Sequence, residues 1–189
     1  MVYGVGVNDS TYPAKIAGKM VKEYTLWVSM LERCYHNKFQ ENHPTYVGCT
    51  TSDKFKHYAY FFEWCQAQIG FNDVGYTLDK DLLVKGNKIY SEDSCVFLPQ
   101  QLNKLITKRQ LDRGLLPIGV TKNGIKYKTR CNVQGKEKYL GLFDTPELAF
   151  YAYKTFKEAH IKELAEKYKD TIDQRAYQAL LNYEVDIND

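Results

Sequence analysis

Two glycine-containing turns divide the segment from Pro117 to Phe143 into three short strands, and this pattern constrains the fold more than any other part of the chain. The turns are Asn123-Gly124 and Gln134-Gly135. Asn-Gly between alternating residues is a strong hairpin signal. The sequence therefore predicts a three-stranded antiparallel meander.

The middle strand of this meander has two different faces, because successive side chains of a strand point to opposite sides. One face is cationic and polar, with Lys126, Lys128, Arg130 and Asn132. The other face carries side chains that can pack, Tyr127, Thr129, Cys131 and Val133. We therefore expect one solvent-facing basic surface and one buried surface.

A helix that can cover the packing face follows directly in the sequence. Asp144-Thr145-Pro146-Glu147 supplies an N-cap Thr, a Pro at the first helical position and an acid in the first turn. Small and aromatic residues then recur at spacings of three and four, at Ala149, Ala152, Tyr153, Phe156 and His160. The pattern predicts a helix from Pro146 to about Lys167, and with it an α+β fold.

The positive charge of the chain is concentrated in this region. Residues 104–138 hold ten Lys or Arg against two acidic residues, a net charge of +8, whereas the whole chain has a net charge of only +3. A concentrated basic patch is an electrostatic footprint for phosphates. A solvated sheet face with scattered lysines is the alternative interpretation.

The pattern Gly-Val, then Lys-Tyr-Lys-Thr-Arg, then Gly-Lys-Glu-Lys-Tyr-Leu-Gly-Leu-Phe-Asp-Thr-Pro-Glu resembles the Apetala or ethylene-response-factor DNA-binding domain over residues 117–167. Members of that family insert a three-stranded sheet into the major groove of duplex DNA. The resemblance implies a DNA-facing set of Lys122, Lys126, Lys128, Arg130, Lys138 and Tyr139, beside which Asn132 shares the cationic face. Arg130 is the best candidate for reading guanine, because its fork makes two hydrogen bonds.

Composition places the chain among globular proteins with one good core or two small ones, at 189 residues, 44% apolar and 26% charged. No apolar run approaches eighteen residues and no signal-peptide core is present, so we expect a cytoplasmic protein without a membrane span. Five cysteines without a CxxC pair predict buried free thiols. A dispersed zinc site at Cys34, Cys49 and Cys95 is an alternative, although zinc needs four ligands.

The N-terminal half predicts two aromatic-rich helices and a strand-loop-strand unit. The helices are expected at residues 22–34 and, with Asp53 as cap, at residues 54–69. Strands are expected within residues 76–99, followed by a short helix at residues 100–105. A carboxylate at the end of the first strand and an Asn in the helix are the layout of a one-metal nuclease site. Asp79 and Asn103 offer oxygen ligands for Mg²⁺ or Mn²⁺.

A second resemblance covers nearly the whole chain. It is carried by Tyr24-x-x-Trp27, Met30-Leu31-x-Arg33-Cys34-Tyr35, Pro44-Thr45-Tyr46, Leu78-Asp79-Lys80-Asp81, Gly86-Asn87-Lys88 and Cys95-Val96-Phe97-Leu98-Pro99 with Asn103. This order of motifs is similar to phage-encoded HNH endonucleases with a C-terminal Apetala-type domain, which resemble homing endonucleases. It implies metal-dependent hydrolysis of phosphodiester bonds in duplex DNA, in the cytoplasm of a bacterial host.

The chain departs from the HNH pattern where a histidine general base is expected, because Asp79 or Lys80 holds that place. A carboxylate with a pKa of about 4 is a weaker base at neutral pH. The expected catalytic set is therefore a degenerate one, Asp79, Lys80, Asp81 and Asn103. A charged turn is the alternative for this stretch, and His57 is a less favoured replacement for the base.

These patterns predict an HNH-like module at residues 1–106, a linker at 107–116, an Apetala-type domain at 117–170 and a helical extension at 171–189. The leading hypothesis is a DNA endonuclease. The first alternative is a nuclease-inactive, sequence-specific DNA-binding regulator derived from such an enzyme. A third is an inhibitor that binds a host protein through the acidic N-terminal half.

Overall fold

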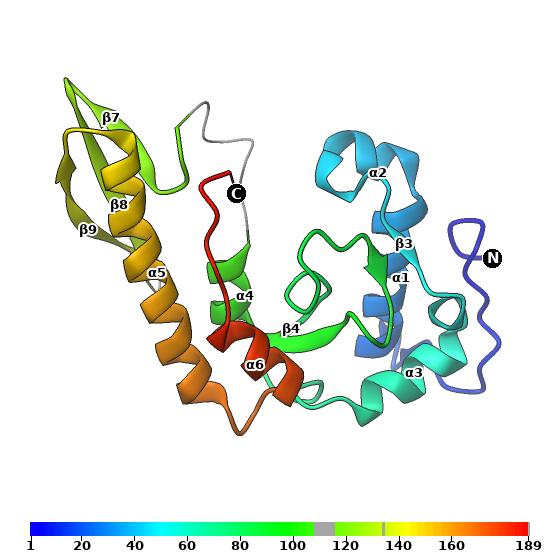
Figure 1. Cartoon of the computed structure of the whole chain (residues 1–189). Coiled ribbons are helices and arrows are strands. Elements are labelled where there is room, and N and C mark those ends of the chain that lie inside the picture. The colour runs from blue at the N-terminus through cyan, green and yellow to red at the C-terminus, as the bar shows by residue number, and fades with distance from the viewer. Residues whose placement is uncertain (108–115, 134, 189) are drawn as a thin grey trace. The chain divides into compact units, whose positions relative to one another are not determined.

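The computed structural model describes residues 1–107, 116–133 and 135–188 and has an α+β fold (Figure 1). The chain forms two compact units. The first comprises residues 1–98 with 171–176, and the second comprises residues 99–170 with the C-terminal residues from 177. The second unit therefore begins before the linker predicted at residues 107–116, of which residues 108–115 lie outside the described part of the chain.

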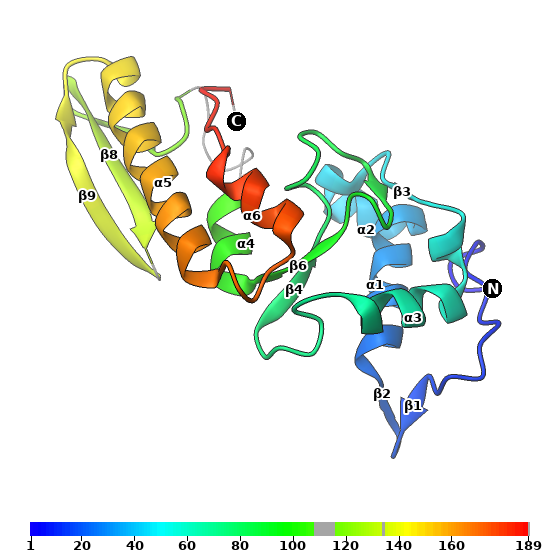
Figure 2. The ribbon, with the colours of Figure 1, turned by 60° about the horizontal axis from the view of Figure 1, so that its bottom comes forward.

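The first unit contains short strands packed with helices (Figures 1 and 2). Its helical segments are α1 (Lys22–Tyr35), α2 (Asn37–Asn42), α3 (Tyr58–Ala67) and two 3-10 turns, Pro44–Tyr46 and Lys54–Lys56. Its strands are β1 (Lys15–Ile16), β2 (Lys19–Met20), β3 (Thr50–Thr51), β4 (Tyr76–Asp79), β5 (Ile89–Tyr90) and β6 (Val96–Pro99). β3 pairs in parallel with β5, and β4 pairs with β6, so the predicted strand-loop-strand is confirmed.

The second predicted helix begins later than expected, and the prediction that Asp53 caps it is wrong. Asp53 instead forms an ion pair with Lys56 at 2.7 Å. The backbone of Val7 bonds to the carbonyl of Lys56 and the amide of Tyr58, at 2.9 and 3.0 Å. These bonds hold residues 56–58 as an extended corner, so that the regular helix starts at Tyr58.

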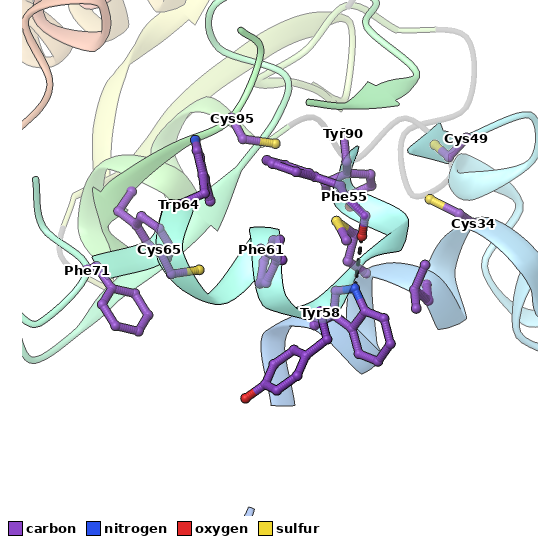
Figure 3. Close-up of a cluster of buried hydrophobic side chains, with 14 residues drawn as sticks. Cys34, Cys49, Phe55, Tyr58, Phe61, Trp64, Cys65, Phe71, Tyr90 and Cys95 are labelled. Carbon is purple, nitrogen blue, oxygen red and sulfur yellow. Dashed lines mark hydrogen bonds between the residues drawn. The ribbon is translucent and has the colours of Figure 1, made fainter. Parts of the chain in front are cut away.

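An aromatic core holds the first unit together (Figure 3). Its largest fully buried side chains include Trp27, Phe55, Tyr58 and Phe61. The indole nitrogen of Trp27 donates to the carbonyl oxygen of Phe55 at 2.9 Å, so the polar atom of this buried ring is satisfied. The predicted aromatic faces of the two helices therefore meet in one core.

The second unit is a three-stranded antiparallel sheet packed on a long helix, as predicted (Figures 1 and 2). Its elements are α4 (Gln100–Ile106), β7 (Val120–Asn123), β8 (Lys126–Val133), β9 (Lys136–Phe143) and α5 (Pro146–Tyr168). The division between the units falls within α6 (Gln174–Leu181), which is shorter than the predicted C-terminal helix. Within the described residues, no helix combines the length and apolar character needed to cross a membrane.

The helix α5 begins where the sequence predicts. The hydroxyl of Thr145 accepts from the amide of Leu148 at 3.2 Å, and Pro146 is the first helical residue. The buried face of α5 includes Ala149 and Tyr153, as expected, and also Phe150 and Ile161. This face covers the packing side of the sheet.

A glycine allows the helix to approach the sheet closely. Gly119, just before β7, has a φ of +77°, and a Cβ there would lie 2.1 Å from the ring of Tyr153 on α5. Only glycine meets both the backbone conformation and the space available. The aromatic ring of α5 therefore packs directly on the sheet backbone.

Candidate nucleic-acid interface

The strand register divides the sheet into a face covered by α5 and an uncovered face, which we call the outer face. Residues directly opposite each other in antiparallel strands point to the same side. The pairs Lys128↔Leu142 and Arg130↔Tyr139 therefore belong together, as do Asn123↔Lys126 and Asn132↔Glu137. The outer face consists of Thr121, Asn123, Lys126, Lys128, Arg130, Asn132, Glu137, Tyr139 and Leu142.

Five residues predicted to contact DNA lie on this face, Lys126, Lys128, Arg130, Asn132 and Tyr139. The predicted alternation along β8 is confirmed, because Thr129 and Cys131 are buried on the other side. The three cations therefore project from the surface that faces away from α5. Tyr139 is 59% exposed and is the outer face's aromatic side chain.

The structure does not bring Lys122 and Lys138 onto the outer face. Lys122 lies opposite Tyr127 and Lys138 lies opposite Cys131, both on the side of the sheet that packs on the helix. The ammonium of Lys138 lies 4.5 Å from the ring centre of Phe156 on α5. The alternation of side chains along each strand places these two lysines on the opposite face from the other cations. A count of charges along the sequence does not show this difference.

A β-bulge places Tyr139 beside Arg130. The register shifts between Thr129 and Arg130, because Thr129 lies opposite Gly141 and Arg130 lies opposite Tyr139, which leaves Leu140 without a partner. A regular ladder would have placed Leu140 outward and Tyr139 under the helix. Leu140 instead packs against the core of the second unit.

Two carboxylates partly neutralise the positive charge of the outer face. Lys126 forms an ion pair with Asp144 at 3.1 Å, and the guanidinium of Arg130 pairs with the carboxylate of Glu137. Among the described residues, no ion pair involves Lys128. Neither carboxylate was singled out from the sequence, although the pairing of β8 with β9 brings Glu137 diagonally beside Arg130.

Asn132 has a structural role in addition to its place on the outer face. Its side-chain oxygen accepts from the amide of Gly135 at 2.9 Å and so closes the turn between β8 and β9. Gly135 has a φ of +83°, whereas Gln134, the other residue of this predicted turn, lies outside the described residues. In the first hairpin the register centres the turn on Gly124-Ile125 rather than on Asn123-Gly124.

The carboxylate of Asp79, predicted as a metal ligand, closes a turn after β4. Its Oδ1 accepts from the amides of Asp81 and Leu82, at 3.0 and 2.8 Å. The side chain is buried, and this burial raises the pKa of the carboxyl. The charged-turn alternative therefore accounts for the contacts of Asp79.

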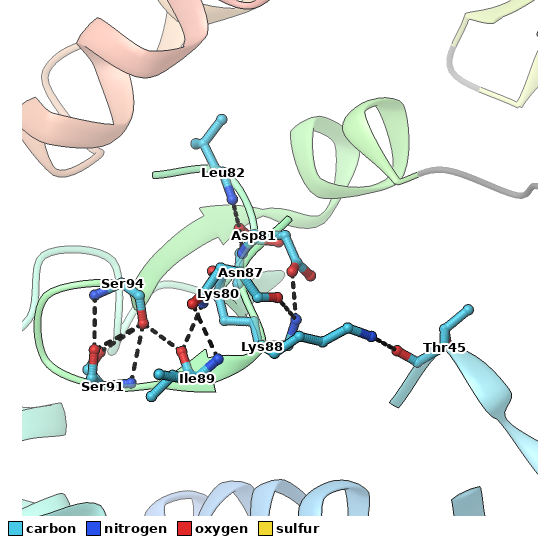
Figure 4. Close-up of polar contacts among 10 residues, drawn as sticks. Thr45, Lys80, Asp81, Leu82, Asn87, Lys88, Ile89, Ser91 and Ser94 are labelled. Carbon is cyan, nitrogen blue, oxygen red and sulfur yellow. Dashed lines mark hydrogen bonds and ion pairs between the residues drawn. The ribbon is translucent and has the colours of Figure 1, made fainter. Parts of the chain in front are cut away.

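Lys80 and Asp81 are held in the same loop (Figure 4). The buried ammonium of Lys80 donates to the carboxylate of Asp81 and, at 3.1 Å, to the carbonyl of Asn87. The side-chain nitrogen Nδ2 of Asn87 donates in turn to the backbone carbonyls of Lys80 and Ile89, at 2.6 and 2.7 Å. An ammonium thus lies against the carboxylate that would otherwise be open to a cation.

Asn103 lies on α4 in the second unit, so the predicted metal ligands Asp79 and Asn103 do not lie within one unit. Among the described residues, no cluster of three His, Cys, Asp or Glu side chains is suited to a metal ion. Binding of Mg²⁺ or Mn²⁺ stays a prediction.

His57 and the cysteines are also engaged within the protein. The Nδ1 of His57 lies 2.6 Å from Oδ2 of Asp9, and this contact lowers the pKa of Asp9. All five cysteines are buried free thiols, as predicted. Burial raises the pKa of Cys34 and of Cys95 to about 12, so that both remain protonated at neutral pH.

Comparisons with family models, with curated proteins and with solved structures found no match to this chain. The interpretation of the outer face therefore rests on its own geometry and chemistry.

Proposed function

We propose that this chain is a duplex-DNA-binding protein whose outer face lies against the major groove. One observation carries the proposal: Lys126, Lys128 and Arg130 project together from the face of the sheet that α5 leaves uncovered. Cations on one rigid surface neutralise phosphates and release counterions, which drives binding to DNA. The sheet is a rigid platform because its other face is packed on a helix.

Charge supports the second unit as the DNA-binding part. It holds fifteen basic and eleven acidic residues, a net charge of +4, whereas the first unit holds eleven and twelve, a net charge of −1. Positive potential on one part of the molecule steers that part toward a polyanion. The first unit contributes no comparable excess.

The dimensions of the sheet suit a duplex. Neighbouring strands lie about 4.8 Å apart, so the outer strands of a three-stranded sheet are separated by about 10 Å. The major groove of B-form DNA is about 12 Å wide, whereas the major groove of RNA helices is too narrow for side chains to read. Binding to single strands relies on several aromatic rings for base stacking, and the outer face offers Tyr139.

We further propose that binding, rather than cleavage, is the main activity, as in the nuclease-inactive regulator. The support comes from the loop after β4, where Asp79 closes a turn and Lys80 neutralises Asp81. Endonuclease activity, which the resemblance to HNH enzymes implies, stays a prediction. The same resemblance is the basis for proposing the cytoplasm of a bacterial host as the place of action.

The experiment pairs a binding assay with a cleavage assay on the full chain. Fluorescence anisotropy would compare random-sequence duplex DNA, the same DNA as single strands, and duplex RNA. We expect the tightest binding to duplex DNA. Equal or tighter binding to single strands, or no binding to any duplex, would contradict the proposal.

For cleavage, supercoiled plasmid would be incubated with Mg²⁺, with Mn²⁺ and with a chelator. We expect intact plasmid in all three conditions. Metal-dependent nicking that disappears in Asp79→Ala but persists in a variant of the outer face would establish the endonuclease instead.

A further inference from the structure

We propose that Glu137 is a specificity-determining residue, which restrains Arg130 so that the guanidinium engages a guanine edge in preference to a phosphate. This inference rests on the proposed DNA-binding function. It concerns a carboxylate on the outer face, where a negative charge opposes binding to a polyanion. The presence of such a residue on a basic surface, beside the guanidinium of Arg130, therefore needs a reason.

The geometry joins the two side chains. Glu137 and Arg130 lie diagonally across β8 and β9, and the guanidinium Nη1 is paired with the carboxylate oxygen Oε2. The Glu137 side chain is 62% exposed and that of Arg130 is 37% exposed, so both groups are accessible to a ligand. Tyr139 lies directly opposite Arg130 in the register and on the same face of the sheet.

A guanidinium has five N–H donors, of which a guanine edge uses two. Arg130 can therefore contact guanine O6 and N7 while the remaining donors keep their bond to Glu137. A phosphate differs, because it brings its own negative charge close to the Glu137 carboxylate. The carboxylate thus penalises contacts of Arg130 with the DNA backbone more than contacts with guanine.

The substitution Glu137→Gln separates the effect of the side chain's charge from the effect of its shape. The amide keeps the length of the side chain and one acceptor oxygen, but removes the negative charge. We expect affinity for random-sequence duplex to rise about three- to tenfold near 0.1 M salt, because one repulsive charge is lost from the interface. Affinity for a preferred sequence should change less than about twofold, so that the ratio of the two affinities falls.

The test begins with selection of bound sequences from a randomised duplex pool by the wild-type chain, followed by the same selection with Glu137→Gln. Glu163→Gln is the matched control, because it removes one exposed carboxylate from α5 in the same unit. The expected result is a weaker preference for guanine with Glu137→Gln and an unchanged preference with Glu163→Gln. Circular dichroism and thermal unfolding would confirm that each variant is folded.

The outcomes separate this inference from the proposed function. If the wild-type chain binds duplex DNA but Glu137→Gln leaves both random-sequence affinity and guanine preference unchanged, the role of Glu137 is refuted and DNA binding stands. An equal rise in the affinity of Glu163→Gln for random-sequence duplex would show that the effect comes from net charge alone, and would also refute the role of Glu137. If the wild-type chain binds no duplex, the proposed function itself fails.

Discussion

At the scale of single residues, Asp79 shows how burial and hydrogen bonding define a role. Its Oδ1 accepts two backbone amides, and the carboxyl is held in a site that raises its pKa. An Asn side chain offers the same acceptor oxygen without a charge. We therefore expect Asp79→Asn to preserve stability or increase it, and Asp79→Ala to lose about 1–3 kcal/mol of unfolding free energy.

Urea unfolding at pH 4 and pH 7 would measure this difference and its dependence on pH. Because the pKa of Asp79 is higher in the folded state, its ionisation disfavours folding as the pH rises through that pKa. Asp79→Asn should therefore gain stability relative to the wild type between pH 4 and pH 7. A loss of stability in Asp79→Asn as large as that in Asp79→Ala would contradict the role in the turn.

The cysteines give a second prediction at this scale. Burial raises the pKa of every cysteine thiol, and thiolates are the reactive form. We expect iodoacetamide to modify the folded protein slowly at pH 8 and all five cysteines rapidly in denaturant, as counted by mass spectrometry. Fast modification of any one thiol in the folded protein would show that its site is open to solvent.

At the scale of elements, the contact of Gly119 with Tyr153 joins the sheet to α5. A Cβ at Gly119 would clash with the aromatic ring and would also occupy a positive-φ conformation. Gly135 also has a positive φ, but nothing lies within 4 Å of the position of its Cβ. It therefore offers a control that carries the backbone cost without the clash.

We expect Gly119→Ala to lower the free energy of unfolding by at least about 2 kcal/mol more than Gly135→Ala does. Chemical denaturation of both variants, monitored by far-UV circular dichroism, would measure the difference. Equal losses in the two variants would show that the approach of α5 to the sheet is not tight at this point.

The sequence predicts the elements of the second unit well but not the face on which every residue lies. Period-two alternation places Lys126, Lys128 and Arg130 correctly, because β8 is regular enough for parity to hold along it. It does not carry through the bulge of β9, which places Tyr139 outward and Leu140 inward, and the two predicted lysines on the wrong face are Lys122 and Lys138. Gly141, within the strand and with a φ of +143°, is the sequence signal for that bulge.

The sequence does not predict the contacts of the proposed metal ligands, for a physical reason. Spacing groups Asp79, Lys80 and Asp81, but it does not show which partners a side chain has. The contacts of Asp79 with amides and of Asp81 with an ammonium depend on how the loop folds back toward Asn87. Likewise, the hydrogen bonds of Val7 that fix the start of α3 come from a segment fifty residues earlier in the chain.

At the scale of the whole molecule, we propose that one face of one sheet provides the binding energy for duplex DNA. The net charge of +4 on the second unit would also attract DNA at long range. Removing one positive charge weakens both this attraction and the direct contacts, so a single substitution does not distinguish the two effects. A matched pair of triple variants does. Both variants carry the same total charge but lose it from different surfaces.

The most direct measurement is the affinity for random-sequence duplex DNA as a function of salt, for three forms of the full chain. The first is the wild type. The second has Lys126, Lys128 and Arg130 replaced by Ala on the outer face, and the third has the exposed Lys162, Lys167 and Lys169 replaced by Ala in and after α5.

Each phosphate contact contributes about 0.9 to the slope of log affinity against log salt. We predict that the outer-face variant loses most of its affinity and that its slope becomes shallower by about 2 to 3, while the helix variant keeps a slope within about 1 of the wild type. Equal losses in the two variants, or an unchanged slope in the outer-face variant, would contradict the assignment of DNA binding to this face.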